Sequence, residues 1–77
     1  MPNVIFLENM PQDTDFSDIC SIFVAFGVVV RVLRKENDFY VFFKNENEAL
    51  LAYLATKDGK FEYKGETVTV SLINEAK

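Results

Sequence analysis

Two groups of aromatic side chains are the residues of this chain best suited to contact a ligand. Phe6 lies in the apolar hexamer of residues 5–10, and Tyr40 and Phe42 lie in the aromatic run of residues 39–43. Because side chains alternate between the two faces of a strand, each segment can fill a core with one face and display rings on the other. Exposed flat rings can stack on other flat groups. We therefore expect a sheet with one face that carries aromatic rings.

Residues for catalysis or metal binding are few. The chain has no histidine and one cysteine, Cys20, which excludes histidine-based acid–base chemistry and an ordinary structural zinc site. Its glycines, Gly27, Gly59 and Gly65, do not cluster into a phosphate-binding loop. We expect no enzyme activity, no cofactor, no metal and no small-molecule substrate.

Length and composition predict one small domain over residues 1–77, excised from a longer protein. There is no run of roughly 18 apolar residues, so no contact with a membrane is expected. One cysteine excludes an internal disulfide and favours a reducing intracellular compartment, either nuclear or cytoplasmic. The 8 basic and 12 acidic residues give a net charge of −4, which weighs against strong binding to a polyanion.

The first half of the chain predicts a strand over residues 4–8 and then a helix. Asp15 and Asp18 have the spacing of residues that cap a helix start. The helix should run to about residue 26, with Gly27 as a left-handed C-terminal cap.

Residues 29–35 and 38–43 predict two strands joined by a two-residue turn, which fixes their register. That register separates a side facing the helices from an open side. The open side of the whole sheet is expected to carry Val4, Phe6, Glu8, Arg31, Leu33, Lys35, Asp38, Tyr40, Phe42, Thr69 and Ser71.

Asn45 and Glu48 predict a capping box for a second helix that ends near residue 56. A short extended piece at Phe61 and Tyr63, a turn at residues 65–66 and a last strand over residues 67–72 follow. The order β-α-β-β-α-β predicts an α+β, ferredoxin-like domain. Its four-stranded antiparallel sheet should have the order 4-1-3-2, with two helices on one face.

Over essentially its whole length the chain resembles the RNA-recognition motif (RRM) family. Residues 5–10 match the family's second RNP motif, with Phe6 at the position that stacks a base. Residues 36–43 match the octamer motif poorly, because Glu36, Asn37 and Asp38 stand where the family has a basic residue, a glycine and an aromatic. Tyr40 keeps a second stacking ring.

The resemblance implies a domain that contacts short single-stranded RNA within an RNA-processing or mRNA-regulating protein. We expect this binding to be weak, because one stacking ring and the basic phosphate contact are missing. The expected RNA-binding residues are Phe6, Arg31, Leu33, Tyr40, Phe42, Ser71 and Asn74.

An alternative is a protein-interaction module that has lost RNA binding and uses its helices, either for a partner protein or for a homodimer. Both predicted helices have apolar residues beyond those needed to face the sheet. Some of them could instead pack between the helices or under Phe61 and Tyr63. The residues expected to form this second surface are Phe16, Cys20, Val24, Leu50, Leu51 and Leu54.

Overall fold

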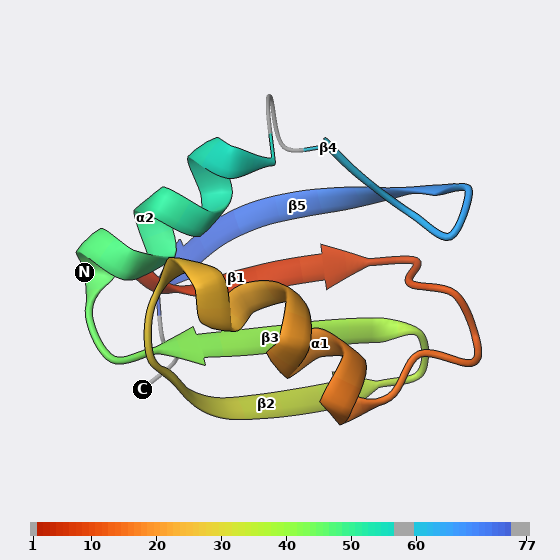
Figure 1. Ribbon diagram of the computed structural model, residues 1–77, viewed down its shortest axis with the longest axis horizontal. Coiled ribbons are helices and arrows are strands. Elements are labelled where there is room, and N and C mark those ends of the chain that lie inside the picture. The colour runs from red at the N-terminus through yellow and green to blue at the C-terminus, as the bar shows by residue number, and fades with distance from the viewer. Residues whose placement is uncertain (1, 57–59, 75–77) are drawn as a thin grey trace.

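Over residues 2–56 and 60–74, the computed structural model forms a five-stranded antiparallel sheet with helices on one face (Figure 1). The strands are β1 (Pro2–Glu8), β2 (Val29–Lys35), β3 (Asp38–Phe43), β4 (Lys60–Tyr63) and β5 (Glu66–Asn74). The helices are α1 (Phe16–Phe23), continued by the 3-10 turn η1 (Val24–Phe26), and α2 (Glu46–Ala55). Neither α1 nor α2, as far as the structure describes them, is long and apolar enough to cross a membrane.

The strand order is β2-β3-β1-β5-β4, so the α+β, ferredoxin-like arrangement is confirmed, but the prediction of four strands was wrong. The extended piece is a true strand, β4, which pairs with β5 at one edge of the sheet. The turn between them is formed by Lys64 and Gly65, with φ of 52° and 81°, one residue earlier than predicted. Hairpin turns with positive φ at both central positions favour glycine and disfavour lysine. The sequence therefore indicates only one of the two turn residues.

The predicted register of β2 and β3 is confirmed. Leu33 pairs with Tyr40, and Arg31 pairs with Phe42. One shift in register occurs near the start of β2, where Val29 pairs with Phe43 and Val30 is the extra residue. Because of this bulge, the alternation of faces restarts at Arg31.

The core lies between the helices and the covered face of the sheet. Burying each large apolar side chain stabilises the fold by about 1.5–3 kcal/mol before the entropy cost of ordering it. The buried cluster consists of Ile5, Leu7, Met10, Ile19, Phe23, Phe39, Val41, Phe43, Ala49, Ala52, Val68 and Val70.

The start of α1 is capped as the sequence predicts. The Asp15 carboxylate accepts a hydrogen bond from the Asp18 backbone N–H at 2.9 Å, and the Asp18 carboxylate accepts one from the Asp15 N–H at 3.1 Å. Both acids also lie at the positive end of the helix dipole. The reciprocal pair fixes where the chain enters the helix layer.

Gly27 does not act as the predicted left-handed cap. Its φ of 162° is extended, and the last turn of the helix tightens into η1 instead. Glycine is needed here because the chain passes against α2: a Cβ added at Gly27 would lie 2.5 Å from Glu48 Cβ. The constraint comes from the close approach, which no local sequence pattern reveals.

The Asn45–Glu48 pair forms half of the predicted capping box. The Asn45 side chain accepts a hydrogen bond from the Glu48 N–H at 3.0 Å. The Glu48 carboxylate turns away from the cap backbone. It accepts one hydrogen bond from the Val28 N–H at 2.8 Å and another from the Asn45 side-chain amide at 3.4 Å. Glu48 thereby joins the start of α2 to the segment that leads into β2.

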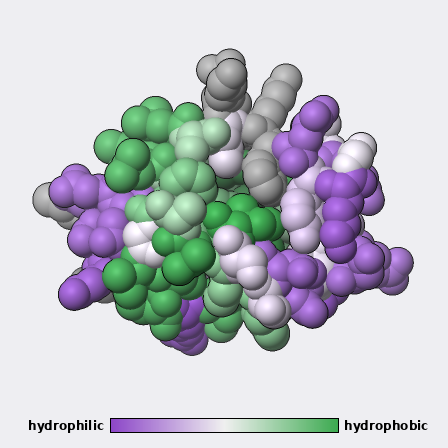
Figure 2. Space-filling model, in the orientation of Figure 1, coloured by the Kyte–Doolittle hydropathy of each residue, from purple (hydrophilic) through white to green (hydrophobic). Residues whose placement is uncertain are grey.

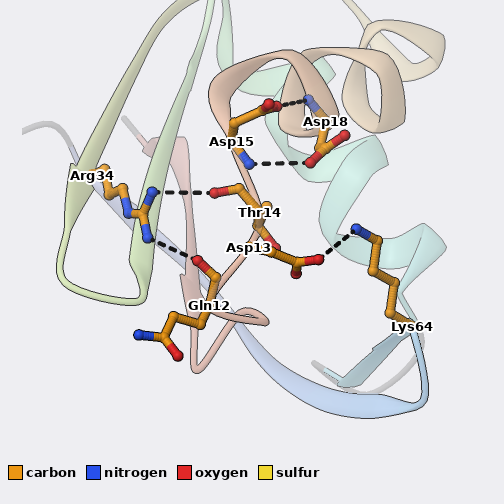
Figure 3. A network of polar contacts seen from close by, with 7 residues as sticks. All are labelled: Gln12, Asp13, Thr14, Asp15, Asp18, Arg34 and Lys64. Atoms are coloured by element: carbon orange, nitrogen blue, oxygen red, sulfur yellow. Dashed lines mark hydrogen bonds and ion pairs between the residues drawn. The ribbon is translucent and has the colours of Figure 1, made fainter.

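The loop between β1 and α1 is held by Arg34 of β2 (Figure 3). Its guanidinium donates to the carbonyl oxygens of Thr14 at 3.2 Å and Gln12 at 3.3 Å, and its Nε donates to the carbonyl of Glu36 at 2.7 Å. Across the same loop, Asp13 Oδ2 lies 3.6 Å from Lys64 Nζ. Desolvation lowers the pKa of Lys64, but the Asp13 carboxylate and neighbouring groups raise it, and the net shift is upward.

Candidate nucleic-acid interface

The uncovered face of the sheet carries two rows of side chains that cross neighbouring strands. The register brings Leu33, Tyr40, Phe6 and Ser71 into the first row. A second row, one step along the strands, consists of Arg31, Phe42, Val4 and Ile73. Side chains opposite each other in such rows are about 4.5–5.5 Å apart at Cβ, so neighbours in each row contact one another.

Phe6 and Tyr40 form the centre of this surface. Their ring centroids lie 4.6 Å apart with an interplanar angle of 30°, and both residues are half-buried. The contact fixes each ring against the other, which limits the conformational entropy lost when a further flat group stacks on them. Leu33 borders the pair on one side and is 39% exposed.

The Phe42 ring contacts a charged side chain, unlike the Phe6 and Tyr40 rings, which contact each other. The Arg31 guanidinium carbon lies 5.4 Å from the centroid of the Phe42 ring, within the range of a cation–π contact. The contact places an exposed positive charge beside the aromatic pair. Val4 was expected to be accessible on this face, but it is 1% exposed, and its cross-strand partners are Phe42 and Ile73.

One end of the open face is acidic. Glu8 follows Phe6 on the same side of β1, and Asp38 begins β3 opposite Lys35. Asp38 has a structural contact, because its carboxylate accepts the backbone N–H of Asn9 at 3.1 Å. Asn9 has a φ of 62°, so the carboxylate supports the left-handed residue that directly follows β1. Asp38, which stands where the resemblance expects an aromatic residue, therefore supports the chain where it leaves β1.

The structure brings most of the predicted RNA-binding residues together on the open face. Asn74 ends β5 opposite Pro2, but its side chain lies outside the described part of the structure. The residues gathered on this face are Phe6, Arg31, Leu33, Tyr40, Phe42 and Ser71.

The second predicted set lies on the helix layer, on the opposite side of the molecule. Phe16, Val24, Leu50, Leu51 and Leu54 are all among the exposed large hydrophobic residues, and Cys20 is exposed. These side chains are therefore not buried between the helices, and the alternative that some pack under Phe61 involves a side chain outside the described part of the structure. Phe16 retains one core contact, an edge-to-face arrangement with the buried Phe39 ring at 6.0 Å.

Two further valines are exposed, although no sequence pattern distinguishes them from buried strand residues. Val28 directly precedes the edge strand β2 and Val30 lies near its start, and both are more than half exposed. Val28 also lines a shallow depression with Cys20 and Val24. Within residues 2–56 and 60–74, no cluster of three or more histidine, cysteine or acidic side chains is placed to hold a metal ion.

No protein-family model matches the sequence, and a comparison with curated proteins gives no significant match. Solved structures do match. The RRM domain of S. pombe Puf1 is 23% identical with a TM-score of 0.81, and the alignment covers 95% of this chain and 99% of that one.

Two further structures are similar at lower sequence identity. The Nab3 RRM, described for cis-element recognition of non-polyadenylated RNAs, is 17% identical over 99% of this chain and 100% of that chain, with a TM-score of 0.83. The Rna15 RRM, solved with bound RNA (GU), is 12% identical over 97% and 86% of the two chains, with a TM-score of 0.82. The chain therefore has the fold of the RNA-recognition motif.

Proposed function

We propose that this domain binds short single-stranded RNA weakly by stacking bases on Phe6 and Tyr40. The observation that carries the proposal is this pair of half-buried rings, 4.6 Å apart on the uncovered face of the sheet. A sheet face of a small domain normally presents polar side chains to water when nothing covers it. Adjacent aromatic rings on it are suited to a flat ligand such as a nucleobase.

The energetics favour a short footprint and a modest affinity. Stacking contributes roughly 1–3 kcal/mol per base, so two rings supply about 2–6 kcal/mol. A dissociation constant of 1 μM corresponds to about 8.2 kcal/mol, so other contacts must contribute if binding is to be tighter than micromolar. Arg31 provides one charge beside the rings, whereas Glu8 and the net charge of −4 oppose the approach of phosphates.

The flanking residues have separate proposed roles. Arg31, held against Phe42, contacts a phosphate, and Leu33 extends the apolar surface beside Tyr40. Ser71, opposite Phe6, offers a hydroxyl that can donate to or accept from a base edge. Asn74 at the end of β5 is the remaining proposed contact.

The structural neighbours support this proposal. The Nab3 domain is described for recognition of RNA elements, and the Rna15 domain was solved with RNA bound. By analogy we infer that the domain serves an intracellular RNA-processing or mRNA-regulating protein, in the nucleus or cytoplasm, by binding rather than catalysis.

A two-dimensional amide NMR titration with a pool of short degenerate RNA tests the proposal. We expect shifts concentrated around Phe6, Leu33 and Tyr40. Tyr40→Ala should abolish them, and the matched Tyr40→Phe variant, which keeps the ring, should retain them. If no residue shifts at millimolar RNA while both variants remain folded, the proposal is wrong.

A rival function, protein interaction with RNA binding lost, rests on the exposed apolar residues of the helices, and the structural neighbours do not favour it. Salt dependence separates the two functions. Binding of single-stranded RNA weakens with a log–log slope of about −0.7 per phosphate contact, whereas a hydrophobic protein contact responds little to salt.

A further inference from the structure

The aromatic pair on the open face is followed along β1 by a carboxylate. Glu8 lies two residues beyond Phe6, so its side chain leaves the strand on the same face. Each strand residue adds about 3.4 Å, which places the two Cα atoms about 7 Å apart. A base that stacks on Phe6 and extends along β1 therefore brings one edge to the Glu8 carboxylate.

The Glu8 carboxylate is half-buried and has no protein partner in the part of the chain that the structure describes. The β1–β3 register places Asp38 beside it, and the Asp38 carboxylate already accepts the N–H of Asn9 at 3.1 Å. Lys35, a basic residue in the same row, lies one strand further away, opposite Asp38. Two groups that only accept hydrogen bonds therefore lie side by side, and the Glu8 carboxylate is left to water or a ligand.

A carboxylate next to a stacked base discriminates between bases by their hydrogen-bond donors. An ionised carboxylate accepts hydrogen bonds and donates none, and its binding partner must supply a donor when water is displaced. Cytosine, adenine and guanine each carry an exocyclic amino group, whereas uracil carries carbonyl oxygens in these places. Uracil has one N–H donor, but that donor stands between two carbonyl oxygens, which a carboxylate repels.

We propose that Glu8 selects against uracil on the Phe6 ring and favours a base that presents an exocyclic amino group. This role of Glu8 rests on the proposed RNA binding and names the class of base that the site takes. The carboxylate accepts a hydrogen bond from the amino group of the favoured base. A uracil in the same place leaves the carboxylate facing a carbonyl oxygen, and a site built to recognise a donor rejects a ligand that lacks it.

The other polar groups around the rings do not make the same choice. The Ser71 hydroxyl, opposite Phe6 on β5, can either donate or accept. Arg31 is held against Phe42, in the row on the other side of the aromatic pair from Glu8. The rings thus have a donor on one side and an acceptor on the other, which orients a nucleotide with its phosphate toward Arg31 and its amino edge toward Glu8.

The surroundings of Glu8 also suit a polar base edge. Figure 2 views the molecule from the helix side and shows hydrophilic side chains gathered at the end toward which β1 runs. On the open face, Glu8 is paired with Thr69 of β5, whose side chain is exposed. A base edge that reaches Glu8 therefore enters polar rather than apolar surroundings.

Two tetranucleotides of single-stranded RNA, tetracytidylate and tetrauridylate, test the proposal on the full chain. Their bases have the same ring size and differ in the group that cytosine presents as an amino group and uracil as a carbonyl. Affinities are measured by two-dimensional amide NMR titration. We expect tetracytidylate to bind at least about fivefold more tightly than tetrauridylate, with a shift of the Glu8 amide.

The variant Glu8→Gln assigns the preference to this side chain. Glutamine offers both a carbonyl oxygen and an amino group, so it can pair with either base, and the preference for cytidine should fall below about twofold. The weaker repulsion of phosphates raises both affinities and cancels in their ratio. Glu46→Gln, the same change at the start of α2, is the control and should keep the wild-type ratio. Melting curves show that both variants are folded.

Equal binding of the two tetranucleotides by the wild type, or tighter binding of tetrauridylate, would overturn the role of Glu8 while leaving RNA binding in place. An unchanged ratio in Glu8→Gln would assign the preference to another residue and would overturn it as well. Failure of both tetranucleotides to shift any amide at millimolar concentration would instead contradict the proposed RNA binding itself, and the role of Glu8 with it.

Discussion

Gly27 and Glu48 are in direct contact where the end of η1 passes the first turn of α2. Glycine leaves room for the Glu48 side chain, whose carboxylate accepts the N–H of the next residue, Val28, at 2.8 Å. The end of the first helix thus meets the start of α2 through a close approach that requires glycine and through one hydrogen bond. This contact positions the start of β2, which carries Arg31 and Leu33 on the open face.

Replacing Gly27 by alanine should destabilise the fold, because the added Cβ would lie 2.5 Å from Glu48 Cβ and 2.6 Å from its Cγ and Cδ, so the whole side chain would have to move. We expect a loss of about 1–3 kcal/mol in the free energy of unfolding, measured by urea titration. Ala25→Ser, which adds one atom at an exposed site nearby, is the control and should change stability by less than about 0.5 kcal/mol. Equal stability of Gly27→Ala and wild type would contradict the contact.

Arg34→Lys should destabilise the domain although it preserves the charge. The planar guanidinium reaches the carbonyls of Gln12, Thr14 and Glu36 together, and an ammonium group cannot span them. We expect a loss of about 1–2 kcal/mol, measured by thermal or urea unfolding. Arg31→Lys, on the open face, is the matched control; a similar loss there would show that the effect is not specific to the loop.

Much of the fold follows from local patterns in the sequence, and those patterns account for the open face. The two-residue turn fixes the β2–β3 register, which brings Leu33 to Tyr40, and Asp15 with Asp18 forms the expected cap. These features depend on residues close together in the chain. Alternation of side chains then decides the faces without further information.

The features that could not be predicted depend on contacts between distant segments. The close approach of Gly27 to Glu48 and the reach of Arg34 to Gln12 appear only once the layers are packed. The strand β4 was missed as a sheet member because four residues next to a turn carry too little periodicity to distinguish a paired strand from an extended loop.

Glu8→Gln should strengthen RNA binding. The carboxylate follows Phe6 on the open face and repels phosphates that approach the rings. Removing one charge at this distance should raise the affinity about two- to threefold at low salt, less at high salt, in fluorescence anisotropy titrations. Glu46→Gln, the same change at the start of α2, should have no comparable effect; if it does, net charge rather than position decides the affinity.

Arg31→Gln should remove one phosphate contact. The log–log dependence of RNA affinity on salt should become shallower by about 0.7, and the affinity should fall. Lys64→Gln, in the turn between β4 and β5, removes the same charge away from the rings and should leave the slope unchanged. An unaltered slope in Arg31→Gln would show that this guanidinium does not contact phosphate.

The most direct test of stacking on the open face compares the RNA affinity of Phe6→Leu and Tyr40→Leu with that of Phe16→Leu, which changes an exposed ring on the helix layer. Affinities for one degenerate pool of short single-stranded RNA would be measured by calorimetry, with unfolding curves showing that each variant is folded. We predict that Phe6→Leu and Tyr40→Leu each weaken binding by roughly five- to a hundredfold, whereas Phe16→Leu binds as wild type does. Wild-type affinity in both sheet variants would contradict RNA binding by this face.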